Sequence, residues 1–241
     1  MTITLLETRE FEEWEGHLSQ AIGHHRSSLL TPALPFLSRM RVAQAGSVSV
    51  VAVEGQSSVR LHRHQPQDRV VLWLPRQGWV EERVNGISLI AEPGTAMLCL
   101  PGDELLGDTS PSLQGYSVVL PFPLLGDPGL WQGFRPRHLT MGSESMSLIS
   151  IAMELVASVL EAKPDSQQLV AALADQLLFW RALSEEAPSD RILGPIERRQ
   201  PASRAGQGVD GSPSGRPLPD HGSGQPHASH GLGASRAQAA F

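Results

Sequence analysis

The sequence predicts a mainly β fold with added helices: an antiparallel β-barrel of the jelly-roll kind, followed by an antiparallel helical hairpin. Between residues 39 and 120, short β-rich runs alternate with turn residues at nearly regular spacing. No stretch of helical periodicity separates those runs, which excludes parallel crossover units. After residue 140 the apolar residues recur at the spacing of amphipathic helices.

The first expected element is a helix over Thr8–Ile22. His24, His25 and Arg26 follow it directly. We expect these three residues on the surface, because cationic side chains suit the free carbonyl groups at a helix C-terminus.

Eight strands are expected after this helix. The clearest hairpin signal between them is Asn85-Gly86, because both residue types accept the positive φ angles that a type I′ turn requires. The expected strands are Arg41–Ala45, Val48–Glu54, Ser58–His62, Arg69–Leu74, Trp79–Val84, Ile87–Ala91, Ala96–Leu100 and Gly115–Leu120.

Two helices are expected over Ser145–Glu161 and Gln167–Leu183, each with one apolar stripe, and Pro164 separates them. The hairpin carries more apolar surface than one contact with the barrel would cover, so we expect it to form a homodimer. The residues expected at the dimer contact are Met153, Val156, Leu169, Leu173, Leu177 and Trp180.

The chain divides by composition into four parts. Residues 1–140 hold the first helix and the barrel, 141–186 the hairpin, 187–199 a linker and 200–241 a tail. In the tail, 26 of 42 residues are Gly, Pro, Ser or Ala, so we expect it to be disordered.

The tail also suggests a genetic origin. Of the 19 basic residues in the chain 18 are Arg, which is typical of a GC-rich coding sequence. GC-rich codons read out of frame give mainly the residue types found in the tail, so we expect a frameshift near codon 200. The alternative is a genuine disordered appendage.

Charge and cysteine content limit the function and the location. The chain has a net charge of −6, so it lacks the positive field that favours nucleic acid or an anionic membrane surface. Its single cysteine, Cys99, lies in an apolar run and is expected to be a buried small hydrophobe. The sequence shows no secretion signal or membrane-spanning run, so we expect a cytoplasmic protein.

The sharpest local pattern surrounds His62 and His64 at the end of an expected strand, because histidines two residues apart on a strand project to the same face. With Asp68 as a third ligand, they could hold a metal ion. The spacing resembles the first motif of metal-binding cupins, but the His expected after the turn at Pro101-Gly102 is absent. We therefore predict no metal and no other cofactor, and we expect these residues to be partly exposed polar residues at the barrel mouth.

Two further features indicate a small-molecule site. Arg60 and Arg63 place positive charge beside the two histidines, which opposes a cation and favours an anionic ligand. Trp73 and Trp79 flank a turn and either line a pocket or fill the core. The candidate ligand-binding residues are Arg60, His62, His64, Asp68, Trp73 and Trp79.

The order of these parts resembles the cupin-like N-terminal effector-binding and dimerisation domain of AraC-type transcription regulators, over about Thr8–Gln200. Residues that match its pattern are Arg60, His62, Arg63, Gly78, Gly102, Asp103, Asp108, Thr109 and Pro111. The resemblance implies an effector pocket inside the barrel and homodimer contacts through the helices. It also implies a following DNA-binding domain with two helix-turn-helix units, for which the residues after Arg199 show no pattern.

The sequence therefore predicts a ligand-sensing and dimerisation domain that is not an enzyme and does not bind DNA directly. Its expected partners are a small-molecule effector of anionic character and either a second copy or an intact relative in a mixed dimer. The alternative is a metal-dependent cupin enzyme, a small dioxygenase or isomerase, with His62, His64 and Asp68 as metal ligands.

Overall fold

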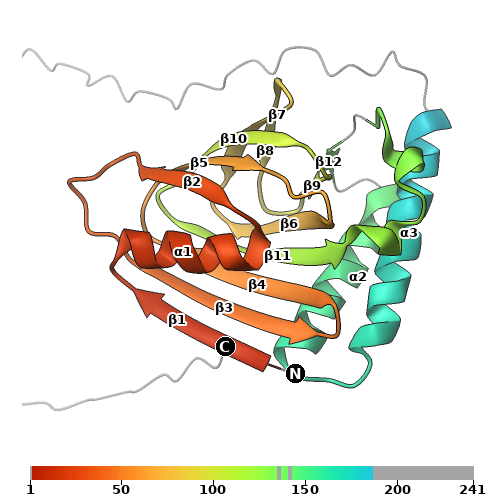
Figure 1. The fold of residues 1–241 in the computed structure, drawn as a ribbon, viewed down its shortest axis with the longest axis horizontal. Coiled ribbons are helices and arrows are strands. Elements are labelled where there is room, and N and C mark those ends of the chain that lie inside the picture. Colours follow the sequence, from red (N-terminus) through yellow and green to blue (C-terminus); the bar gives the residue numbers. More distant parts are fainter. Residues whose placement is uncertain (1, 135–136, 141–142, 187–241) are drawn as a thin grey trace, which may run out of the picture. The chain divides into compact units, whose positions relative to one another are not determined.

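The computed structural model describes residues 2–134, 137–140 and 143–186. In these residues the strands pair antiparallel in two sheets that form the walls of a barrel (Figure 1). One sheet has the order β1 (Thr2–Thr8), β3 (Ser38–Ala45), β4 (Val48–Gly55), β11 (Leu113–Pro121), β6 (Arg69–Gln77), β9 (Ala96–Cys99) and β12 (His138–Leu139). The other has the order β2 (His25–Leu29), β5 (Val59–His64), β10 (Glu104–Thr109), β7 (Val80–Val84) and β8 (Ile87–Ala91).

The predicted fold class is confirmed, and each of the eight expected strands is present. The hairpin between β7 and β8 turns at Asn85 (φ 49°) and Gly86 (φ 85°), as a type I′ turn requires. The structure adds β1, β2, β10 and β12, which sequence reasoning missed. Strand β10 was missed because its Gly107 and Asp108 are residue types that strands disfavour.

Strands β6, β9 and β11 of the larger sheet are buried on both faces along most of their length, which explains their continuous apolar runs. In β6, Val70 and Leu72 pack into a core that includes the C-terminal helices. Val71 and Trp73, which alternate with them, face the barrel interior. The smaller sheet instead keeps one face exposed, so its strands alternate between buried and exposed residues.

Helix α1 (Phe11–Ile22) runs along the opening between the two sheets (Figure 1). Trp14, Leu18 and Ile22 on one of its faces are buried in the barrel core. The expected helix over Thr8–Ile22 is thus shorter at its start, because Thr8 is the last residue of β1.

The predicted surface position of His25 is wrong. His25 begins β2 and is 3% exposed, and its Nδ1 lies 3.1 Å from the carbonyl oxygen of Gly23. The helix ends at Gly23, whose φ of 114° suits glycine, and no basic residue occupies its last turn.

The predicted helical hairpin is confirmed: α2 (Ser143–Leu160) and α3 (Ser166–Glu186) lie side by side against the larger sheet (Figure 1). Two short 3₁₀ helices, η1 (Phe122–Leu125) and η2 (Pro128–Trp131), precede them. Of the six residues expected at a dimer contact, Val156, Leu173, Leu177 and Trp180 are buried in the chain's own core. Met153 and Leu169 are half-buried beside it.

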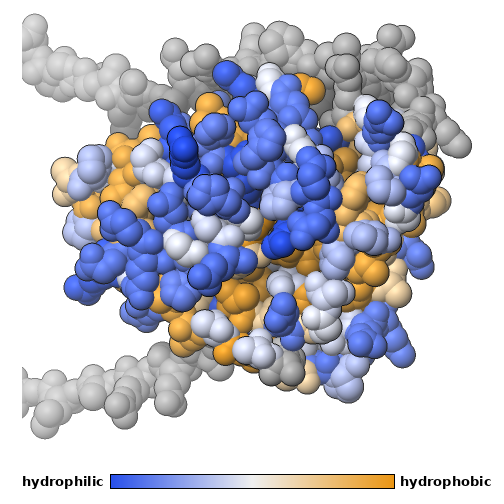
Figure 2. Space-filling model, in the orientation of Figure 1, coloured by the Kyte–Doolittle hydropathy of each residue, from blue (hydrophilic) through white to orange (hydrophobic). Residues whose placement is uncertain are grey.

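Hydrophilic residues cover much of the face that contains β2 and β5, and hydrophobic residues show in patches below it (Figure 2). No helix among the described residues is long and apolar enough to cross a membrane. The linker over 187–199, the tail over 200–241 and the frameshift expected near codon 200 lie outside the described residues.

Candidate ligand-binding site

The interior of the barrel contains a small cavity of about 80 Å³. Most of its wall is apolar and comes from both sheets and from α1. Two ionisable side chains also line it, Arg63 from β5 and Glu82 from β7, and both are more than nine-tenths buried. Two charge-bearing groups inside an apolar core are costly unless they have partners, so the cavity is the first candidate site.

Two glycines make room for the larger polar side chains. A Cβ atom on Gly107 of β10 would lie 2.5 Å from Cγ of Glu82, its register partner on β7. A Cβ atom on Gly115 of β11 would lie 2.4 Å from the indole ring of Trp73. The missing side chains therefore let Glu82 and Trp73 occupy the barrel interior.

Several polar atoms of the residues that line this cavity lack protein partners. Glu82 Oε2 and the indole Nε1 atoms of Trp14 and Trp73 are buried without a hydrogen bond. The Arg63 guanidinium donates to Cys99 Sγ at 3.2 Å, and a thiol is a weak acceptor. Buried polar groups are nearly always satisfied, so this cluster indicates a place for a bound molecule or for water.

Burial changes the acidity of the groups in the barrel. Desolvation raises the pKa of Glu82 from 4.5 to about 7, and the positive charge of Arg63 opposes this rise. Desolvation likewise raises the pKa of the Cys99 thiol to about 12, which leaves it a poor nucleophile. The expectation that Cys99 is a buried hydrophobe is confirmed by its complete burial.

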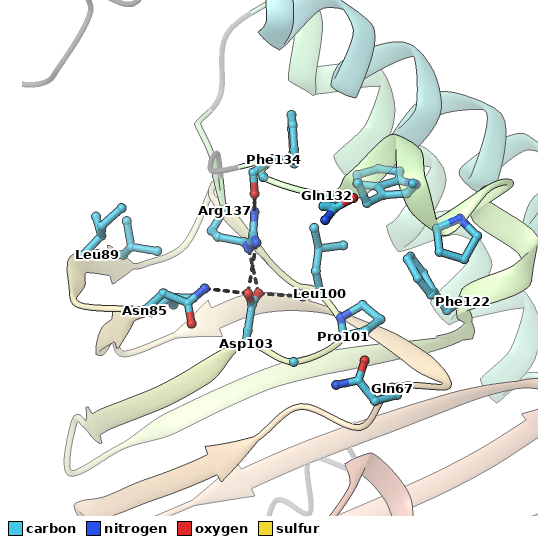
Figure 3. Close-up of a pocket in the computed structure, with 17 residues that line it drawn as sticks. Gln67, Asn85, Leu89, Leu100, Pro101, Asp103, Phe122, Gln132, Phe134 and Arg137 are labelled. Carbon is cyan, nitrogen blue, oxygen red and sulfur yellow. Dashed lines mark hydrogen bonds and ion pairs between the residues drawn. The ribbon is translucent and has the colours of Figure 1, made fainter.

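A second, larger cavity of about 700 Å³ opens at the end of the barrel beside η2 (Figure 3). Its central carboxylate, Asp103, accepts hydrogen bonds from Leu100 N at 2.8 Å and Asn85 Nδ2 at 2.7 Å. Arg137 Nε also donates to Asp103 at 2.6 Å, and Arg137 further donates to the carbonyl oxygen of Phe134. These partners join the β7–β8 turn, the β9–β10 turn and the segment before β12, so Asp103 serves as a structural clamp.

Other residues of the predicted pattern also have structural contacts. Arg60 pairs with Asp108 across β5 and β10 through two hydrogen bonds of 2.7 Å. Thr109 Oγ1 accepts a hydrogen bond from Val59 N at 2.9 Å.

Most of the predicted ligand-binding residues lie outside the barrel. Arg60, His62 and His64 point outward from β5, and His62 Nε2 lies 3.3 Å from a carboxylate oxygen of Glu104. Asp68 is exposed and pairs with Arg69 at 3.0 Å. The structure does not bring these residues to the interior cavity.

The two tryptophans predicted as ligand-binding residues lie in different environments. Trp73 lines the cavity, whereas Trp79 is 42% exposed.

His62, His64 and Asp68 do not come together as metal ligands, and no other group of three or more His, Cys, Asp or Glu side chains does so among the described residues.

Sequence reasoning missed Glu82 and Trp14 as site residues, and it used Arg63 as a positive charge beside the two histidines without including it among the ligand-binding candidates. A signal for two of them was present: Arg63 alternates with the buried Val59, and Glu82 lies between the buried Val80 and Val84. Period-two alternation places such residues on the inner face. Trp14 gave no comparable signal, because the position of α1 depends on the barrel.

Comparison with known proteins identifies the family to which this arrangement belongs. A family model described as an AraC-binding-like domain matches residues 14–184. The AraC-like transcriptional activator CuxR has a similar crystal structure, with 15% sequence identity, a TM-score of 0.62, and coverage of 74% of this chain and 70% of that one. At this identity the likeness is one of fold.

Smaller regions overlap with two other structures. They are the cupin domain of Cnp3 from Schizosaccharomyces pombe (12% identity, TM-score 0.31, 37% of this chain and 70% of that one) and KdgF from Halomonas sp. (18% identity, TM-score 0.31, 40% and 86%). A comparison with curated proteins found no significant match.

The family model covers well over half of the chain and spans α1, both sheets and the helical hairpin. The resemblance seen in the sequence is therefore confirmed. The chain belongs to the AraC-binding-like domain family and is a ligand-binding domain of the kind found in AraC-type transcription regulators.

Proposed function

We propose that this chain senses a small molecule inside its barrel, without catalysing a reaction, and passes that signal to transcription through a second copy of itself or an intact relative. The observation that carries the proposal is the barrel cavity, which is lined by four polar groups that lack strong partners: Arg63, Glu82 and the indoles of Trp14 and Trp73. A bound molecule would satisfy these groups and gain from their burial.

The hairpin supports the dimer part of this proposal. On α3 the residues Leu169, Ala172, Gln176, Phe179 and Leu183 recur at alternating spacings of three and four, the pattern of a helix-pairing seam. Phe179 is 55% exposed, and Leu169 and Leu183 are half-buried. We therefore propose that this seam, rather than the buried stripe of Leu173 and Leu177, contacts a second copy.

The sensing function is tested by thermal unfolding of the whole chain with a panel of sugars, amines, amino acids, carboxylates and phenols. A true effector raises Tm, because it binds the folded state alone. The rise should disappear in Ser117→Leu, which fills the cavity, and should persist in the matched variant Ser88→Leu on the exposed part of β8. Stabilisation that persists in Ser117→Leu would show that binding occurs elsewhere.

The dimer is tested by sedimentation velocity at tens of micromolar protein. We expect a dimer for the wild-type chain and a monomer for Phe179→Glu, with unchanged circular dichroism because the side chain is exposed. The matched control is Glu154→Gln, an exposed change on α2. A wild-type monomer throughout this concentration range would contradict the dimer.

A further inference from the structure

The hydrogen-bonding character of the barrel cavity specifies the class of its ligand, if the chain is a sensor as proposed above. The two indole N–H groups and the Arg63 guanidinium can only donate. Glu82 also becomes a donor when its carboxyl group is protonated. A ligand for this set must present acceptors, and an acceptor-only group fits better than hydroxyl or amine groups, which bring donors of their own.

The charges of the cavity residues restrict the class of ligand further. Arg63 carries a permanent positive charge, while Glu82 is largely uncharged below about pH 7. One negative charge on the ligand would balance Arg63 without leaving excess charge in an apolar cavity. A dianion would exceed that balance.

The size of the cavity and the composition of its wall limit what the rest of the ligand can be. The volume of about 80 Å³ is roughly half of the ~150 Å³ cavity that holds benzene in another protein. Leu18, Val71 and Met97 contribute apolar wall. The ligand is therefore compact, with a small apolar remainder.

We propose that the barrel binds a compact organic monocarboxylate, whose oxygens accept hydrogen bonds from Arg63 and from the indole N–H groups of Trp14 and Trp73. The rings of Phe11, Phe36 and His25 pack around Trp14, with centroids 5.5 to 6.3 Å from that of its indole, and this packing holds the indole in place. Trp73 is held over Gly115.

Protonated Glu82 completes the site as a fourth donor. The ionisable groups that interact with Glu82 are Arg63 on β5 and Cys99 on β9. Arg63 stays charged and Cys99 stays a thiol at neutral pH. Glu82 is then the group whose ionisation would repel the ligand, so the carboxylate binds more weakly at pH 8 than at pH 6.

The test follows the indole N–H resonances of the ¹⁵N-labelled whole chain during titration with acetate, propionate and butyrate. Trp14 and Trp73 are assigned by Phe substitution. Trp131 is an internal control, because its Nε1 already donates to the carbonyl oxygen of Leu125 at 3.0 Å. We expect at least one carboxylate to shift the Trp14 and Trp73 resonances saturably and to leave Trp131 in place.

Matched neutral compounds and variants sharpen the result. Propionamide and propanol, which are close to propionate in size, should bind at least ten-fold more weakly. Trp73→Phe keeps the apolar ring but removes one donor, and should weaken carboxylate binding by roughly ten-fold to a hundred-fold. Arg63→Gln should weaken it at least as much, with folding checked by the unchanged Trp131 resonance.

The outcomes separate the ligand class from the sensing function. Equal binding of propionate and propionamide, or no response to any carboxylate, overturns the monocarboxylate. The sensing function still stands if a compound of another class moves the Trp14 and Trp73 resonances or gives a Tm rise that Ser117→Leu removes. If no compound does either, both proposals fail.

Discussion

The burial of Glu82 should make the stability of this protein fall as the pH rises. The pKa of this carboxyl group is 4.5 in the unfolded chain and about 7 in the folded one. A pKa difference of this size corresponds to about 3 kcal/mol of folding free energy. Because the folded state holds the proton more tightly, this contribution is favourable below pH 4.5 and is lost as the pH rises to about 7.

Glu82→Gln should remove this pH dependence, because glutamine has nearly the same shape and does not ionise. Urea unfolding of both proteins, followed by circular dichroism at pH 5 and pH 8, measures the effect. Relative to wild type, we expect the variant to gain about 2 to 3 kcal/mol between these two pH values.

Two histidines contribute to the pH dependence with the opposite sign. Burial lowers the pKa of the buried His25 and of the half-buried His138, so their contribution to stability is lost as the pH falls. The difference between wild type and Glu82→Gln cancels their effect. The matched control is Glu81→Gln on the exposed face of β7, which should follow the wild type at both pH values. A constant difference between Glu82→Gln and wild type at pH 5 and pH 8 would refute the reasoning.

Three further outcomes are expected. Asp103→Ala removes the carboxylate that accepts hydrogen bonds from Leu100 N, Asn85 Nδ2 and Arg137, and it should lower the free energy of unfolding by about 3 to 5 kcal/mol, measured by urea unfolding. A loss below about 1 kcal/mol would contradict the clamp. Gly107→Ala drives a Cβ atom into Glu82 and should lower the free energy of unfolding by about 1 to 3 kcal/mol. Gly55→Ala on β4, with open space around it, should not lower it. An equal loss of stability in the two variants would contradict the close packing. The net charge of −6 predicts no gel retardation of a promoter fragment by the 241-residue chain at about 0.15 M salt, and a shifted band would refute this.

Local patterns in the sequence determined much of the fold. Asn85-Gly86 placed one hairpin because its two residues accept positive φ. Apolar spacing placed α2 and α3, since each needs one continuous face to pack against the larger sheet. Such signals depend on neighbouring residues, so they are readable without knowledge of the tertiary structure.

The interior site depended on strand β10, which the sequence did not reveal. Gly107 of β10 pairs with Leu61 on one side and with Glu82 on the other, so β10 places β5 and β7 in one sheet. Without β10 there was no reason to bring Arg63 and Glu82 into the same cavity. The prominent His62 and His64 drew attention instead, although alternation placed them on the outer face.

The sequence by itself determined the barrel, the hairpin and the family of this chain, because these follow from periodicity, turn residues and local motifs. Only the tertiary structure decided which polar groups face one another. Trp14, Arg63, Trp73 and Glu82 lie on four elements that are separated along the chain, and they line one cavity because the sheets close and α1 covers the opening. Their burial without strong partners, which carries the proposed function, is a property of packing and not of any one segment.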